Sequence, residues 1–202
     1  MKFDIPKARS LLASLSGEVA YDVGARHGDS SAFLAKRFKK VYAFEPLDES
    51  YGKLVALSRQ IKNIEPMKVA LGSASGQAEV VSIIDSKNEL RNVTTLDEVV
   101  ARTGIPDLVK IDADGAELSI LSGAEKTIRA HYPSLYVESQ AENSGAIENL
   151  LRDWGYEWIR VARRKHVQGE NLWYFSMRAI PLSVRARYAL RELASSLIHP
   201  QG

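Results

Sequence analysis

The stretch Tyr21-Asp22-Val23-Gly24-Ala25-Arg26-His27-Gly28-Asp29-Ser30-Ser31 decides the fold of this chain. A short β-favouring segment, residues 18–21, leads into it, and a helical pattern over residues 32–38 follows it. A strand, a glycine turn and a helix in this order bring backbone amides and the positive end of a helix to one point, which predicts a ligand site. The spacing Asp-x-Gly-x-x-x-Gly matches neither the Gly-x-Gly-x-x-Gly dinucleotide fingerprint nor a P-loop.

The next predicted strand, Val41-Tyr42-Ala43-Phe44-Glu45-Pro46, ends in a carboxylate. Pro46 has no backbone N–H with which to extend the ladder. A carboxylate about 20 residues beyond such a turn, at the end of the following strand, is placed to accept hydrogen bonds from ribose hydroxyls. Glu45 and the glycine turn together indicate an adenosine-type ligand. The alternative is that Asp22 and Glu45 are only turn residues at the ends of strands.

The composition is that of an ordinary globular protein. With 202 residues, 45% of them hydrophobic and 26% charged, the chain fits one domain. It has no cysteine, which excludes disulfides, cysteine-ligated zinc and a cysteine nucleophile and fits a reducing compartment, so we expect a cytoplasmic protein. The net charge of +2 argues against nucleic acid as a partner of the whole chain. No stretch approaches the roughly 20 apolar residues of a membrane span.

Strand and helix patterns alternate along the chain. This predicts an α/β fold with a doubly wound, mostly parallel seven-stranded sheet and helices on both faces. The later strands are predicted at 67–71, 108–112, 135–138, 156–161 and 172–177, with a weakly alternating extra strand or hairpin arm at 76–84. The last two strands leave no room for a helix between them, so they should form an antiparallel C-terminal hairpin with the basic run 160–166 at its connection.

The helix patterns lie between these strands. Thr95 and Glu98 form a capping box that should start a helix ending before Gly104. One helix is expected from Asp114 onward, and others over 48–61 and around 147–154. We expect residues 1–17 to be an N-terminal helix and linker, 18–178 the α/β domain, and 179–202 an amphipathic C-terminal helix.

Five motifs carry a resemblance to a known family. They are Asp22-Val23-Gly24-Ala25-x-x-Gly28, Phe44-Glu45-Pro46, Val69-Ala70-Leu71-Gly72, Thr94-Thr95-Leu96-Asp97 and Lys110-Ile111-Asp112-x-Asp114-Gly115-Ala116-Glu117. In this order and spacing they resemble FkbM-type methyltransferases. The resemblance implies the Rossmann-like class I methyltransferase fold, which binds S-adenosylmethionine, and O-methylation of a hydroxyl on a sugar, polyketide or similar small metabolite. Arg26 stands where the family commonly has Asn, and Asp114 where it usually has Glu.

The expected donor site combines the strand ends with this resemblance. Asp22 would receive the cofactor's ammonium, Gly24 and Gly28 would let the backbone approach its methionine part, and Glu45 would take the ribose hydroxyls. The backbone near Ala70 and Leu71 should lie beside adenine. The expected cofactor-binding residues are Asp22, Gly24, Ala25, Gly28, Glu45, Pro46, Ala70 and Leu71.

Two residues are candidates for catalysis. Asp112, at the end of its strand, is either a group that orients or deprotonates the acceptor or a carboxylate bound to loop amides. His27 has a pKa suited to a base at neutral pH, or it is simply solvated. Asp114 and Glu117 form either an acidic pair or the cap and first turn of a helix. No histidines or carboxylates have metal-ligand spacing, so no metal site is indicated.

Other partners stay open. The run Arg163-Arg164-Lys165 suggests RNA as a rival acceptor, or a contact with an acceptor's phosphate, against the simpler interpretation as a solvated turn. A binding module that keeps the cofactor fold without turnover is another alternative. In the tail, Ala186, Leu190, Leu193 and Leu197 form a helical stripe that must be covered by the domain itself, by a second copy in a homodimer, or by a membrane surface.

Overall fold

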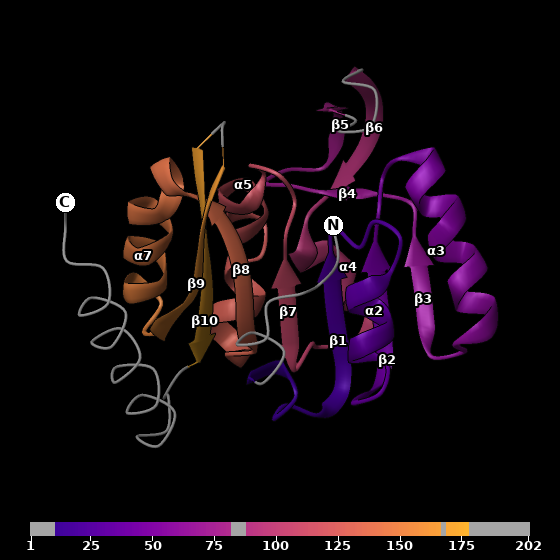
Figure 1. The fold of residues 1–202 in the computed structure, drawn as a ribbon, viewed down its shortest axis with the longest axis horizontal. Coiled ribbons are helices and arrows are strands. Elements are labelled where there is room, and N and C mark those ends of the chain that lie inside the picture. Colours follow the sequence, from indigo (N-terminus) through magenta and orange to yellow (C-terminus); the bar gives the residue numbers. More distant parts are fainter. Residues whose placement is uncertain (1–10, 82–87, 167–168, 178–202) are drawn as a thin grey trace.

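A seven-stranded sheet organises the computed structural model, which describes residues 11–81, 88–166 and 169–177 (Figure 1). The strand order is β3-β2-β1-β7-β8-β10-β9. The strands are β1 (Gly17–Val23), β2 (Phe38–Phe44), β3 (Ile64–Met67), β7 (Leu108–Ile111), β8 (Ser134–Gln140), β9 (Glu157–His166) and β10 (Gly169–Met177). The neighbouring pairs β3–β2, β2–β1, β1–β7 and β7–β8 are parallel. Strand β10 runs antiparallel to both of its neighbours, β8 and β9. The predicted doubly wound, mostly parallel sheet with an antiparallel C-terminal hairpin is confirmed.

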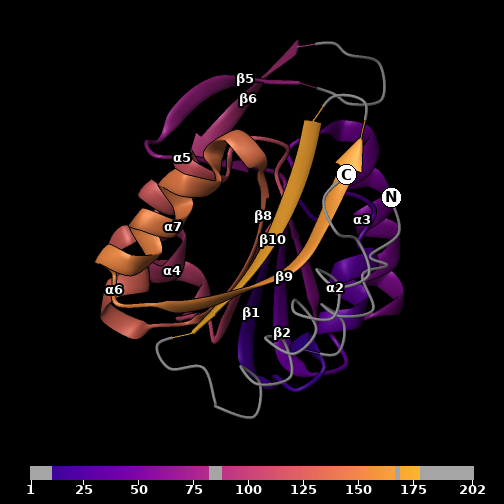
Figure 2. The same ribbon diagram turned by 60° about the vertical axis from the view of Figure 1, so that its left-hand side comes forward.

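Helices cover both faces of this sheet, as Figure 2 shows. On one face lie α2 (Asp29–Leu34) and α3 (Asp48–Gln60). On the other lie α4 (Leu96–Thr103), α5 (Glu117–Ser122), α6 (Glu125–His131) and α7 (Ser144–Asp153), the last preceded by a short 3₁₀ helix, η1 (Ala141–Asn143). The predicted capping box is confirmed, because the side chain of Thr95 accepts a hydrogen bond from the Glu98 N–H at 3.2 Å.

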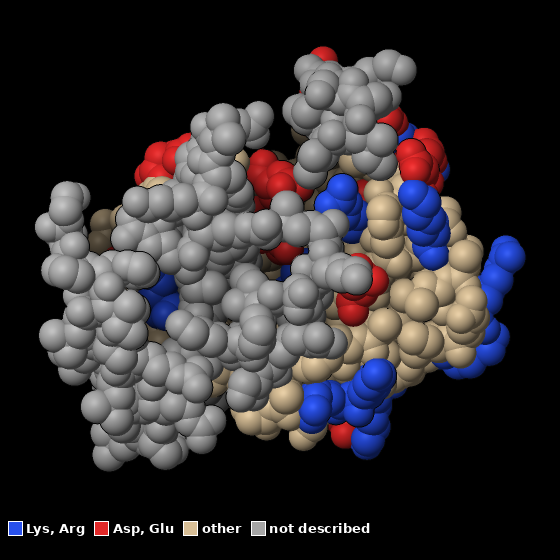
Figure 3. All heavy atoms as spheres, in the orientation of Figure 1, with Lys and Arg blue, Asp and Glu red and all other residues tan. Residues whose placement is uncertain are grey.

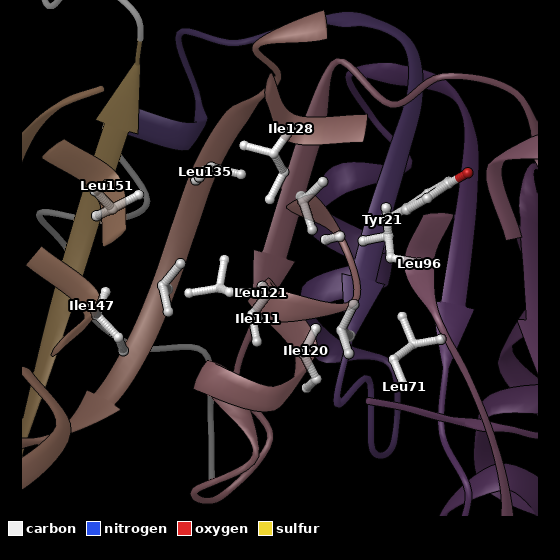
Figure 4. Packing of buried hydrophobic residues seen from close by; sticks show 14 of the residues in the cluster. Tyr21, Leu71, Leu96, Ile111, Ile120, Leu121, Ile128, Leu135, Ile147 and Leu151 are labelled. Atoms are coloured by element: carbon white, nitrogen blue, oxygen red, sulfur yellow. The ribbon is translucent and has the colours of Figure 1, made fainter. Parts of the chain in front are cut away.

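The core is divided by the sheet into two clusters. Figure 4 shows the larger one, in which apolar side chains of α4 to α7 pack against β1, β7 and β8. The smaller cluster joins the opposite face to α2 and α3 through Leu34 and Leu54. Burying each such leucine or isoleucine contributes about 1.5–3 kcal/mol. This two-sided burial explains why Leu108 to Ile111 form a strand in which every residue is buried.

The helix expected from Asp114 onward is interrupted, which the apolar periodicity did not reveal. It is split into α5 and α6 at Gly123. A Cβ atom at Gly123 would lie 1.9 Å from the carbonyl oxygen of Gly72, so the backbones of these two segments touch. The Gly123 carbonyl also accepts a hydrogen bond from the Asp97 N–H at 3.0 Å. The break at Gly123 therefore lets the segment around Gly72 pass close to the backbone between α5 and α6.

A second, three-stranded sheet projects beyond the ends of the parallel strands (Figure 1). Its order is β4 (Ala70–Leu71), β6 (Asn88–Thr94) and β5 (Gly76–Val81). The prediction of one strand over 67–71 is wrong, because β3 ends at Met67 and the chain turns there through a hydrogen bond from the Val69 N–H to the Met67 carbonyl at 3.0 Å. The expected arm over 76–84 is seen as β5 up to Val81, paired with a strand, β6, that was not anticipated.

Two further expectations concern the C-terminal part. The basic run 160–166 lies within β9, paired with β10, so its assignment to the connection is wrong. The C-terminal helix expected over 179–202 lies outside the described residues, as does most of the N-terminal helix expected over 1–17. Within the described ranges, none of the helices combines the length and apolarity that crossing a membrane requires.

Candidate functional site

The candidate site lies where three parallel strands end side by side. Val23 of β1 is in register with Phe44 of β2 and with Ile111 of β7. The residues that follow these strand ends are Gly24, Glu45 and Asp112. Ligands in open α/β sheets bind outside the carboxyl ends of the strands, at the point where the strand order reverses. The topology therefore brings three of the residues singled out in the sequence to one edge, beneath the projecting sheet (Figure 1).

The glycine turn is held by backbone contacts on both sides. The amides of Gly24 and Ala25 donate to the Phe44 carbonyl at 3.1 and 3.0 Å. Gly24 has φ 72°, and a Cβ atom there would lie 1.8 Å from the carbonyl oxygen of Asp112. Gly28 has φ 91°, and its Cβ atom would lie 2.4 Å from Leu57 of α3. Both glycines are thus required by neighbouring parts of the protein itself.

Asp22 lies beneath this turn and is completely buried. The hydroxyls of Ser30 and Ser31 donate to its Oδ2 atom, each at 2.6 Å. Its Oδ1 atom lies 2.9 Å from the ammonium of Lys110. These contacts join β1 to the first turn of α2, so Asp22 shapes the turn from below, with its carboxylate enclosed by protein atoms.

Lys110 also lies at the candidate site, and the sequence analysis did not propose it as a site residue. It belongs to the buried strand β7, and its side chain is 2% exposed. Its ammonium donates to the carbonyls of Val23 and Gly24 at 3.2 and 3.1 Å and lies 3.8 Å from Asp112. Burial lowers its pKa, but Asp22 and Asp112 outweigh that effect and the pKa is raised, so the ammonium is charged. The available signal was a lysine within an otherwise apolar strand, since fully buried lysines are nearly always paired.

Glu45 is oriented by two backbone amides. Its Oε2 atom accepts from the Arg26 N–H, and its Oε1 atom accepts from the Leu47 N–H, both at 2.9 Å. The residue is 5% exposed, and this burial raises its pKa despite the two hydrogen bonds. A carboxylate has about four lone-pair positions, so Glu45 can still accept hydroxyl donors. Pro46 follows directly and leads into α3.

The loop after β7 presents carboxylates. Glu117 is buried, and its Oε1 atom accepts from the amides of Ala113 and Gly115 at 3.1 and 3.0 Å. Glu117 thus lies in the first turn of α5, as the structural interpretation predicts, but the predicted cap at Asp114 is wrong, because the N-cap residue is Ala116. The side chain of Asp112, by contrast, is 38% exposed and faces Lys110 on one side. Partial desolvation, followed by repulsion from Asp112 and Glu117, raises the pKa of Asp114, which has φ 50°.

His27 lies in the turn between the two glycines. Within the described part of the chain, its Nε2 atom is buried without a hydrogen-bond partner. Desolvation lowers its pKa, and the charges of Lys53 and Arg26 lower it further. The imidazole is therefore neutral at pH 7 and has an acceptor nitrogen in the turn that the sequence predicts as a ligand site.

Ala70 and Leu71, which were expected to end the third strand of the main sheet, lie in a separate strand. They form β4, which pairs in parallel with β6 of the small sheet, a few residues beyond the end of β3. Leu71 is buried in the larger core cluster.

On the face seen in Figure 3, acidic side chains are exposed toward the upper, strand-end side of the molecule. No set of three or more potential ligand residues in the described ranges is arranged to hold a metal ion.

Comparison with known proteins places this chain in a protein family. The sequence matches the family model "Methyltransferase FkbM domain" over residues 22–158. The hexuronic acid methyltransferase AglP of Haloferax volcanii is 26% identical over an alignment that covers 56% of this chain and 52% of AglP. The chain thus spans about half the length of this curated relative.

Two solved structures show the same fold. Methyltransferase FkbM from Methylobacillus flagellatus KT is 23% identical, with a TM-score of 0.60 over 79% of this chain and 43% of that chain. Magnesium protoporphyrin IX methyltransferase from Synechocystis PCC 6803, solved with bound SAM, is 14% identical, with a TM-score of 0.54 over 87% of this chain and 78% of that chain. Because the family model covers more than half of the sequence, this chain belongs to the FkbM methyltransferase family.

Proposed function

We propose that this protein transfers the methyl group of S-adenosylmethionine to a hydroxyl of a small metabolite, with a sugar as the first candidate. The observation that carries the proposal is Glu45, a buried carboxylate fixed by two amides at the end of β2 and hydrogen-bonded to the glycine turn. Such a group suits the two ribose hydroxyls of an adenosine-containing donor. Family membership and the AglP relative support methyl transfer and a sugar acceptor.

The residues at the strand ends fit this donor. Glu45 would hold the ribose, and the turn from Gly24 to Gly28 would face the methionine part. Asp22 would act through the turn that it supports, because its carboxylate is enclosed by Ser30, Ser31 and Lys110. When bound, S-adenosylmethionine supplies an electrophilic methyl group on its sulfonium, so alignment and electrostatics are what the protein contributes.

Asp112 is the group that we place at the acceptor. Asp112 follows β7 directly, and its side chain is partly exposed. Its backbone carbonyl packs against Gly24, where a Cβ atom would lie 1.8 Å from the carbonyl oxygen. In this position the carboxylate accepts a hydrogen bond from the acceptor hydroxyl and takes its proton as the hydroxyl attacks. A positioned base typically contributes 10²–10⁴-fold. His27, neutral and with an unpartnered Nε2 atom within the described chain, is the second candidate for this proton transfer.

Methyl transfer can be measured with a donor labelled in the methyl group. The wild-type protein is incubated separately with neutral sugars, uronic acids and RNA, and label in each acceptor is counted. We expect label in a sugar fraction and its loss in Asp112→Asn. Label only in RNA would favour the rival acceptor, and donor binding without label in any pool would indicate a binding module.

A further inference from the structure

Lys110 occupies an unusual position for a charged side chain. It lies in the middle of the sheet, in register with Asp22 on the neighbouring strand β1. The carboxylates whose charges act on its ammonium come from three strands or their ends, namely Asp22 of β1, Asp112 after β7 and Glu138 of β8. The ammonium is therefore enclosed among carboxylates near the carboxyl ends of these strands, where the candidate site lies.

The contacts of this ammonium join the two halves of the proposed site. On the donor side it binds the carbonyls of Val23 and Gly24, which are the last residue of β1 and the first of the turn. On the acceptor side it lies 3.8 Å from the Oδ2 atom of Asp112. Asp22 neutralises it from below at 2.9 Å. One side chain thus contacts the turn and the carboxylate that must be aligned with each other.

A gain in stability alone does not account for the buried ion pair of Lys110 and Asp22. Desolvation of two charges offsets much of their attraction, and replacing a buried ion pair by apolar groups is often neutral or stabilising. What apolar groups cannot replace is the pair of hydrogen bonds to the carbonyls of Val23 and Gly24. Those bonds define the backbone direction at the start of the turn.

We infer that Lys110 is a positioning residue that holds the Gly24 turn and the Asp112 carboxylate in a fixed relation. This assignment rests on the proposed function for its effect on catalysis, but its effect on the turn is independent of any ligand. Removing Lys110 releases the first two peptide units of the turn, so the donor is held less tightly and Asp112 is no longer held toward the turn.

The test separates positioning from charge balance. Lys110→Met leaves Asp22 as an unpaired buried charge and lowers the melting temperature. The double variant Asp22→Asn/Lys110→Met removes both charges and recovers most of that loss, and Asp22→Asn alone is the reference for what Asp22 itself contributes to the turn. A matched control is the exposed pair of Lys39 and Glu18 at the opposite end of the strands, changed to Met and Gln.

Amide hydrogen exchange in the free protein is the first readout. In the double variant we expect protection of the Gly24 and Ala25 amides to fall by at least about tenfold relative to Asp22→Asn alone, while amides of β7 and β8 keep wild-type protection. In the control variant of Lys39 and Glu18 we expect wild-type protection of the turn amides. Wild-type protection of the turn in a stable double variant would overturn the inference.

Binding and turnover form the second readout. For S-adenosylhomocysteine we expect an affinity at least about tenfold weaker in the stable double variant than in Asp22→Asn alone, together with a lower kcat. Restoration of both to wild-type values would show that Lys110 only balances charge. If the wild-type protein itself does not bind this ligand, the proposed function fails, and the exchange experiment still decides the positioning role.

Discussion

Glu45 accepts a hydrogen bond from the backbone N–H of Arg26, 19 residues earlier in the chain, at 2.9 Å. The end of β2 is thereby tied to the glycine turn after β1. Because burial raises the pKa of Glu45 above its ordinary value of 4.5, protonation begins at a higher pH than for an exposed glutamate. A protonated carboxyl is a weaker acceptor for ribose hydroxyls.

Donor affinity should consequently fall as the pH is lowered through the raised pKa of Glu45. The sign follows because the ionised form binds the donor and acid removes that form. Titrations between pH 7 and pH 4.5 measure the effect, and Glu45→Gln should abolish this pH dependence. Equal slopes for the wild type and Glu45→Gln would contradict the assignment of Glu45.

Gly24→Ala should destabilise the protein by more than about 1 kcal/mol, because Gly24 has a positive φ and its new Cβ atom would collide with the carbonyl oxygen of Asp112. Gly52→Ala is a matched control inside α3, where a Cβ atom would have no neighbour within 4 Å. That change should be neutral or stabilise by up to about 1 kcal/mol. Thermal unfolding distinguishes the two variants, and equal melting temperatures would refute the close approach of the two loops.

Asp112→Asn should lower kcat by about 10²–10⁴-fold if Asp112 is the proton acceptor, with little change in donor affinity. Since the lowered pKa of His27 keeps its imidazole neutral at pH 7, a His27 base would give a rate that declines only below about pH 6.5. Steady-state rates of Asp112→Asn and His27→Ala across pH 5–9 assign the role. If the rate changes by less than a few-fold in both variants, neither residue is the base, and alignment of the two substrates accounts for the catalysis.

Stability should hold up to about pH 10 and decline above it. Burial raises the pKa of Tyr21 from 10.0 to about 12, and the pKa of Lys110 is also raised. Between the unfolded and folded pKa values, the unfolded chain has lost protons that the folded chain retains, so rising pH favours unfolding. Denaturant unfolding at pH 9, 10 and 11 measures the decline, and Tyr21→Phe should reduce it. A constant free energy of unfolding up to pH 11 would contradict the raised pKa values of both groups, which burial causes for Tyr21 and the carboxylates of Asp22 and Asp112 cause for Lys110.

Much of the main sheet could be predicted because its strands are short apolar runs separated by helical patterns. Leu108 to Ile111 and the capping box at Thr95 are local signals of this kind. The strand β6, Asn88 to Thr94, escaped prediction because its largely polar residues show no alternation. The split at Gly123 also escaped, since it depends on a backbone contact with Gly72, which is distant in sequence.

The candidate site was likewise predicted only where local sequence signals were sufficient. Glu45 and the Gly24 turn were identified from spacing, because parallel strands end at one edge. The enclosure of Asp22 was not foreseen, since its partners Ser30 and Ser31 reach it only after α2 folds back over β1. The role of Lys110 required knowing that β7 lies beside β1. The basic run 160–166 was misplaced because charged residues within an edge strand look like a turn in sequence.

The central claim, that the edge formed by Gly24 and Glu45 binds S-adenosylmethionine, is tested most directly by calorimetric titration. Wild-type protein is titrated at pH 7.5 with S-adenosylhomocysteine and, separately, with NAD, next to Glu45→Ala and the exposed control Glu65→Ala on β3. We predict sub-millimolar binding of S-adenosylhomocysteine, weakening by roughly 10- to 100-fold in Glu45→Ala alone, and no comparable binding of NAD. Binding of NAD without S-adenosylhomocysteine, or equal affinity in all three proteins, would contradict the account.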